Sequence, residues 1–289
     1  MTNTKINWDK SLLNYGRSRP MYSPEIHKHL AQVIGRDNVL ENDIYTDFIN
    51  EFGTWINSSQ LNNLIGLNEF ATQKIIRGVT HSLDDLHAVF GQRLVILPNE
   101  YKYHQRIKEN QRILPFKEWK KGDVAIVSFP FSHTGCEPSE WQNLIKHCED
   151  NEVEVHIDSA WYGVCRGIEL DLTSPAIASI SFSLSKPLGL GNYPIGLRYQ
   201  RTEMKGPVHT VNEFNMISPL MVHVGLSFIR KFPIDFFQMK YYEAYKLVVE
   251  KFGLIEGKSI HVALEEQNDE VIPVGIRGFL RKIVEGEFR

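Results

Sequence analysis

The sequence predicts an α/β protein with a mostly parallel central sheet flanked by helices, followed by a small C-terminal α+β subdomain. Between residues 74 and 185, short runs rich in Val and Ile alternate with amphipathic stretches of helical period. Strands that alternate with helices imply crossover connections, which join parallel strands. After residue 205 the sequence pattern changes. Two long aromatic-rich stretches are followed by two more strand-like runs, which indicates a separate subdomain.

The first residues predict an arm and two helices. The stretch "NYGRSRP" (14–20) is typical of an extended arm. Residues 23–35 favour a helix, because Ser23 can cap its start, Pro24 fits the first helical position and Gly35 follows its end. Residues 43–57 have apolar side chains at helical spacing. We therefore expect an N-terminal arm and helix over 1–45, a large domain over 46–205 and a small subdomain over 206–289.

The remaining elements follow in order along the chain. Apolar β-branched runs predict strands and amphipathic runs predict helices. The expected strands are 74–79, 93–98, 123–130, 153–158, 177–185, 258–266 and 270–280, and the expected helices are 80–91, 138–151, 217–232 and 234–253.

Composition excludes several classes of protein. A formal net charge of -3 over 289 residues lacks the excess of positive charge that is typical of nucleic-acid-binding proteins. The first residues, "MTNTKINWDKSLLNYG", contain no apolar core of signal-peptide length, and no run approaches the length of a membrane span. The three cysteines are widely spaced, and no group of side chains has metal-ligand spacing. We expect a cytoplasmic protein that binds no metal, nucleic acid or membrane.

Polar residues gather where the expected strands end, and ligands of such sheets lie beyond the carboxyl ends of the strands. Gly78 and Thr80 come between a strand and a helix, where free amides can hold a phosphate, although Thr80 also suits a helix cap. Tyr101 follows a proline turn, where its ring can stack on a flat ligand or pack as a loop residue.

Two further strand ends carry ionisable side chains. Asp158 ends an apolar strand, where a carboxylate needs a cationic partner unless it caps the next turn. Lys186 follows "SFSLS", where a lysine of lowered pKa forms a Schiff base with an aldehyde. The alternative for Lys186 is an ordinary solvated loop lysine.

Together these residues resemble the fold-type I pyridoxal-phosphate (PLP) enzymes, and within them the class I/II aminotransferases. "IDSAWYG" (157–163) is similar to the family's D-x-A-Y element, and "SFSLSK" (181–186) to its S-x-S-K element. "SFPFSHTGCEPSEWQNLIKHCEDNEVEVHID" (128–158) resembles the N-P-x-N-P-T-G stretch, its helix and the aspartate strand. "GVTHSL" (78–83) and "LPNEY" (97–101) stand where the family has its phosphate loop and its stacking aromatic. The resemblance covers about residues 70–200, with all five elements in order.

The resemblance implies PLP as the cofactor and assigns roles. Lys186 would form the Schiff base and then move the substrate proton, and Asp158 would pair with the ring nitrogen. Further cofactor-binding residues would be Thr80, the backbone at His81, Tyr101, Ser132, Trp161 and Ser183.

The sequence also departs from the family. Trp161 replaces a tyrosine and cannot ionise as a phenol does. Pro194 stands where most members have an arginine for the phosphate, eight residues after the lysine. Arg277 follows a strand at about the place of the arginine that binds the substrate carboxylate, and Arg17, in the N-terminal arm, is its rival.

The resemblance implies an aminotransferase acting on a small amino acid, within a homodimer. Another PLP reaction remains open, whether elimination, decarboxylation, racemisation or C–C bond formation, because all use the same scaffold. A non-catalytic descendant of the fold is the third hypothesis. The missing arginine favours this third hypothesis, whereas Asp158 and Lys186 argue against it.

Overall fold

A seven-stranded sheet forms the centre of the computed structural model, which describes residues 6, 8–15, 21, 23–34, 43–268 and 270–286. The strand order is β3-β10-β9-β7-β6-β4-β5. Neighbouring strands are parallel except at β10, which is antiparallel to both β3 and β9. The strands are β3 (Thr72–Ile76), β4 (Leu94–Ile96), β5 (Arg112–Ile113), β6 (Val124–Ser128), β7 (Glu154–Asp158), β9 (Ile177–Ser183) and β10 (Gly196–Gln200).

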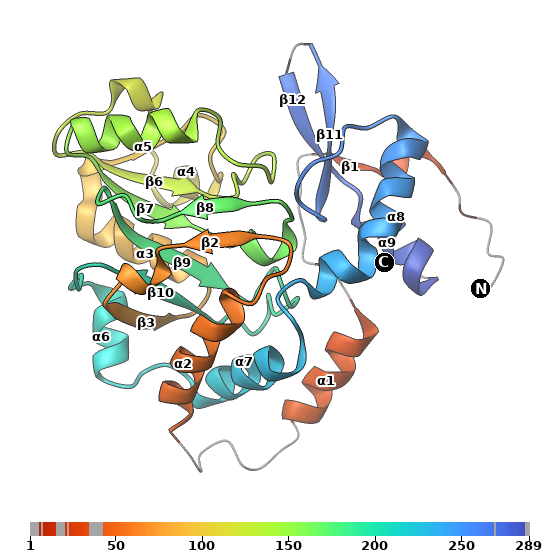
Figure 1. Ribbon diagram of the computed structural model, residues 1–289, viewed down its shortest axis with the longest axis horizontal. Coiled ribbons are helices and arrows are strands. Elements are labelled where there is room, and N and C mark those ends of the chain that lie inside the picture. Colours follow the sequence, from red (N-terminus) through yellow and green to blue (C-terminus); the bar gives the residue numbers. More distant parts are fainter. Residues whose placement is uncertain are drawn as a thin grey trace.

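Helices cover both faces of this sheet (Figure 1). The alternation of side chains along β6 shows the two layers. Val124 and Ile126 pack in a cluster with α3 (Val79–Phe90), on the face that α6 (Pro207–Glu213) also covers. Ala125 and Val127 face the larger core, with α2 (Ile44–Ile56), α5 (Trp141–Asp150) and α7 (Pro219–Lys231). β6 is therefore buried on both sides, as the inner strands of parallel sheets are.

A second, three-stranded sheet joins the two ends of the described chain (Figure 1). It contains β11 (Val262–Gln267), β12 (Glu270–Gly275) and the short β1 (Asn14–Tyr15) from the N-terminal segment. β1 pairs antiparallel with β12, so the N-terminal segment completes the C-terminal sheet. Helices α8 (Phe236–Phe252) and α9 (Arg277–Glu285) pack together beside it, and α1 (Pro24–Ile34) packs on α7.

The predicted helices and strands are confirmed with one correction. The strand predicted over 270–280 ends at Gly275, and α9 begins at Arg277 because Phe279 and Leu280 turn their side chains into the core. Other elements were not predicted: the antiparallel β10, the two-residue β5, the short α4 (Tyr103–Ile107), α6, and a separate parallel pair of β2 (Asn63–Ile65) and β8 (Glu169–Asp171). The division of the chain at residues 45 and 205 stays a prediction. Arg17 lies outside the described residues.

Candidate functional site

Asp158 ends β7 at the carboxyl edge of the large sheet, and it is buried. Its Oδ1 accepts a hydrogen bond from the amide of Ala160 at 2.8 Å. Burial raises the pKa of Asp158 to about 7 in spite of that hydrogen bond; Glu100 raises it further, and Lys186 opposes the rise. A carboxyl group held in this way gains most from a cation that comes to lie beside it.

Lys186 lies in the turn that follows β9, the strand next to β7. Burial lowers the pKa of Lys186, Asp158 opposes this, and Arg277 lowers it further. A lysine of lowered pKa has more of its amine in the neutral form, which is the nucleophilic form. The structure thus brings an amine of lowered pKa within electrostatic range of a carboxyl group of raised pKa.

Glu100 is a buried acid at this edge that the sequence analysis missed. Its Oε2 accepts a hydrogen bond from the amide of Ser128 at 2.8 Å, and its Oε1 accepts hydrogen bonds from the hydroxyl groups of Ser128 and Ser132, the latter at 2.8 Å. Glu100 therefore ties the loop after β4 to the loop after β6. Its position directly after the turn at Pro98 was the available signal.

Tyr101 is the predicted stacking residue, and 43% of its surface is exposed. Its ring is stacked on that of Tyr103, with centroids 5.8 Å apart and planes 20° from parallel. Partial burial and then Asp158 raise the pKa of Tyr101. An accessible aromatic face therefore lies within electrostatic range of Asp158.

The start of α3 faces the residues around the turn after β9. Gly78 has a φ of +73°, and a Cβ built there would lie 3.3 Å from Pro194 Cβ, 3.6 Å from Ser185 Oγ and 3.7 Å from Ser183 Oγ. Ser183 Oγ donates to Ser185 Oγ at 2.9 Å. Ser183, Ser185 and Pro194 therefore lie close to the start of α3.

Thr80 and His81 follow in the first turn of α3. Thr80 is half-buried. The amide of His81 donates to the carbonyl of Gly78 at 3.1 Å, so this predicted phosphate donor already has a partner within the helix start. The amides before it are those that a helix start normally leaves unpaired.

The small sheet brings two basic side chains to the same place. Arg277, at the start of α9, is close enough to Lys186 to lower its pKa. His261 lies just before β11 and is buried, with its ring edge-on to Trp161 at 5.7 Å between centroids. Burial, Lys186 and Arg277 hold the pKa of His261 well below its usual range. His261 was not predicted as a site residue, although a histidine in the apolar run "SIHVAL" was a signal.

The loop after β6 closes against the small sheet. Gly135 has a φ of +71°, and a Cβ there would lie 2.5 Å from Ser259 Cβ and 3.2 Å from the ring of Trp161. His133 Nε2 lies 3.2 Å from the carbonyl oxygen of Val271 in β12. Any side chain at position 135 would therefore push Ser259 and Trp161 apart.

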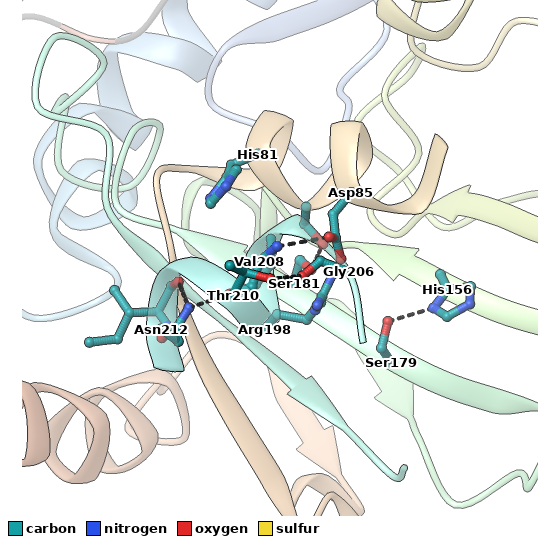
Figure 2. A network of polar contacts seen from close by, with 12 residues as sticks. His81, Asp85, His156, Ser179, Ser181, Arg198, Gly206, Val208, Thr210 and Asn212 are labelled. Carbon is teal, nitrogen blue, oxygen red and sulfur yellow. Dashed lines mark hydrogen bonds and ion pairs between the residues drawn. The ribbon is translucent and has the colours of Figure 1, made fainter. Parts of the chain in front are cut away.

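A separate polar network lies beneath α3, between the helix and the sheet (Figure 2). Arg198 Nη1 in β10 donates to Asp85 Oδ2 at 2.5 Å, and the amide of Val208 donates to Asp85 Oδ1 at 2.8 Å. Ser181 Oγ donates to Ser82 Oγ at 2.8 Å. The network fixes α3 on the sheet and so positions its first turn.

Among the described residues, no group of three or more His, Cys, Asp or Glu side chains could hold a metal ion. No helix in the described ranges is long and apolar enough to cross a membrane.

Comparison with known proteins identifies the fold. No family model matches the chain, and no curated protein matches it in sequence. A PLP-bound C-S lyase from Staphylococcus hominis is 13% identical over 96% of this chain and 89% of its own, with a TM-score of 0.64. A probable N-succinyldiaminopimelate aminotransferase from Thermus thermophilus is 15% identical over 95% of this chain and 83% of its own, with a TM-score of 0.59.

An aminotransferase from Staphylococcus aureus is 10% identical over 94% of this chain and 92% of its own, with a TM-score of 0.60. These similarities confirm the predicted fold class: the chain has the fold of solved structures that include PLP-bound enzymes.

Proposed function

We propose that this protein is a PLP-dependent enzyme. The observation that carries the proposal is the placement of Asp158 and Lys186 at neighbouring strand ends, within electrostatic range of each other. Burial raises the pKa of the carboxyl group to about 7 and lowers the pKa of the amine. Opposite pKa shifts in two ionisable groups that interact electrostatically cluster at functional sites, and the fold is that of PLP-bound structures.

The residues at this edge fit the shape and chemistry of PLP. Asp158 offers a negative charge for a protonated ring nitrogen, and Tyr101 offers an exposed aromatic face. We call the place beside Gly78, next to Ser183, Ser185 and Pro194, the cradle. A Cβ at residue 78 would fill it, and the hydroxyl groups of Ser183 and Ser185 line it. A phosphate fits such a place at a helix start.

When bound, PLP supplies an electron sink that stabilises negative charge at the substrate α-carbon. Lys186 would hold the cofactor covalently through Nζ, and the same amine would move the proton of the substrate α-carbon. Asp158 would keep the ring nitrogen protonated, which favours its own ionised form. Trp161 and Ser132 would orient the ring from the side of the loop after β6.

We propose a small amino acid as substrate, with amino transfer as the reaction. Arg277 would bind the α-carboxylate, because it is the arginine of the small subdomain that interacts with Lys186. Glu100 would support Ser132, whose hydroxyl donates to it. A homodimer and a cytoplasmic location stay predictions, and light scattering of the purified protein tests the first.

An absorption titration with PLP tests the proposal. We expect wild type to develop a visible band that is absent in Lys186→Ala, because only an amine in the site bonds to the aldehyde. A panel of amino acids then separates the reactions: amino transfer releases a keto acid without ammonia, whereas elimination releases both. If wild type showed no band with PLP, the protein would be a non-catalytic descendant of the fold.

A further inference from the structure

Pro194 leaves the cradle at Gly78 without the arginine that the resemblance leads us to expect. Its ring packs there instead, 3.3 Å from the position of a Gly78 Cβ. A phosphate carries up to two negative charges, and helix amides and hydroxyl groups supply only partial positive charge. Another cation near the start of α3 is therefore needed, and Arg77 directly precedes Gly78.

His81 fixes the geometry of Arg77. The backbone amide of Arg77 donates to His81 Nδ1 at 3.2 Å. Burial and then Arg77 lower the pKa of His81 to about 4, so the imidazole is neutral at pH 7. A neutral imidazole carries one proton. Since Nδ1 accepts a hydrogen bond, the proton is on Nε2, and Nε2 is a donor.

This tautomer places two donors side by side. Arg77 Nη2 lies 3.3 Å from His81 Nε2. The guanidinium can only donate, and Nε2–H can only donate, so the two groups cannot satisfy each other. An oxygen atom of an anion lying between them would accept from both, and charge-assisted hydrogen bonds of this kind are among the strongest in proteins.

The surroundings of Arg77 Nη2 and His81 Nε2 also favour an anion. His81 is nine-tenths buried, and it stands at the start of α3, one turn before Asp85 (Figure 2). The hydroxyl groups of Ser183 and Ser185 lie across Gly78 from the helix start. The Asp85 carboxylate, one turn further on, already has Arg198 as its partner.

We infer that Arg77 and His81 hold the phosphate of the cofactor, in place of the arginine that Pro194 replaces. This inference rests on the proposed function. It makes two side chains of the loop before α3, rather than a residue after Lys186, responsible for the preference for a phosphorylated cofactor.

Equilibrium binding of PLP and of pyridoxal, which lacks the phosphate, tests the inference. The visible absorbance of each titration gives its dissociation constant for wild type, Arg77→Met and His81→Asn. We expect both variants to bind PLP about tenfold or more weakly, with pyridoxal affinity unchanged. His81→Asn keeps an oxygen near the position of Nδ1, so the loop retains the acceptor for the Arg77 amide but loses the Nε2 donor.

Two further variants sharpen the test. Arg93→Met removes an arginine from the other end of α3, where Arg93 Nε donates to the carbonyl of Gly122 at 2.7 Å, and should leave both constants unchanged. Pro194→Arg, combined with Arg77→Met, should restore the preference for PLP.

The outcomes separate this inference from the proposed function. If Arg77→Met and His81→Asn kept the wild-type preference for PLP over pyridoxal, the helix amides and the serines would suffice, and the inference would be wrong while the proposed function stood. If wild type bound neither compound, the proposed function would fail and the inference with it.

Discussion

Two aspartates on the same face of the sheet are both buried, but they differ in their partners. Asp85, beneath α3, receives the Arg198 guanidinium at 2.5 Å and the Val208 amide at 2.8 Å, and both side chains of the ion pair are fully buried. Asp158, at the strand end, receives the Ala160 amide, and burial raises its pKa to about 7.

The contrast separates a structural acid from a functional one. A buried carboxylate with a complete set of partners stabilises the fold that surrounds it, and removing one partner leaves an uncompensated charge. A buried carboxyl group with a raised pKa lacks compensation, and a ligand can supply it. Burial alone distinguishes nothing here, because both side chains are buried; their partners do.

The largest expected effect is on stability, at Asp85. Asp85→Ala leaves Arg198 buried without its partner and should lower the free energy of unfolding by about 3–5 kcal/mol. Chemical denaturation measures the loss. Asp84→Ala is the matched control, because Asp84 is exposed and accepts only a surface hydrogen bond from Tyr103, worth about 1 kcal/mol. Equal losses in the two variants would contradict a structural role for Asp85.

Asp158→Asn should lower the turnover rate and leave the stability of the fold intact. We expect unchanged or increased stability without cofactor, because a neutral amide replaces a carboxyl group that burial penalises when it is charged. With PLP, turnover should fall about 100-fold or more, since the charge beside the ring nitrogen is lost. Thermal unfolding and steady-state rates measure the two effects. A large loss of stability would place Asp158 in the same class as Asp85.

The pH dependence of stability without cofactor gives a third test. Because the pKa of Asp158 is raised to about 7 in the folded protein, from an ordinary value of 3.8, the folded state binds more protons between these values. This contribution to stability is therefore complete below about pH 4 and is lost as the pH rises to about 7, by up to about 1.4 kcal/mol per pH unit. The free energy of unfolding of wild type minus that of Asp158→Asn should fall across this range, because all other titrating groups are common to both proteins; a constant difference would rule it out.

The smallest expected effect is at Gly135. Gly135→Ala brings a Cβ within 2.5 Å of Ser259 Cβ and should destabilise the protein by about 1 kcal/mol more than Gly253→Ala. Gly253 has a φ of +62° and open space around it, so it carries the backbone strain without the clash. Thermal unfolding compares them, and equal shifts would mean that the contact relaxes freely.

The sequence was sufficient to predict the parallel strands and their helices, because β-branched runs and amphipathic runs alternate clearly. It was not sufficient for β10, where Arg198 and Gln200 interrupt the apolar pattern although both are buried, Arg198 as the partner of Asp85 in α3. The predicted site residues Asp158 and Lys186 were recognisable as strand ends. Glu100 and His261 had only weak signals in the sequence, since their importance depends on which distant loops meet.

The role of Arg77 could not be predicted from the sequence either. In sequence it is a charged residue at a strand end, with nothing to distinguish it. Its relation to the site follows only from the tautomer of His81, which depends on a hydrogen bond to the Arg77 amide.

The central claim is that Lys186 is the amine that bonds to PLP beside Asp158. The most direct measurement is borohydride reduction of the protein with PLP, followed by proteolysis and mass spectrometry of the modified peptides. We predict that the reduced cofactor is attached to the peptide containing Lys186 and is absent from that peptide in Lys186→Ala. Attachment at scattered surface lysines, with Lys186 unmodified, would contradict the claim.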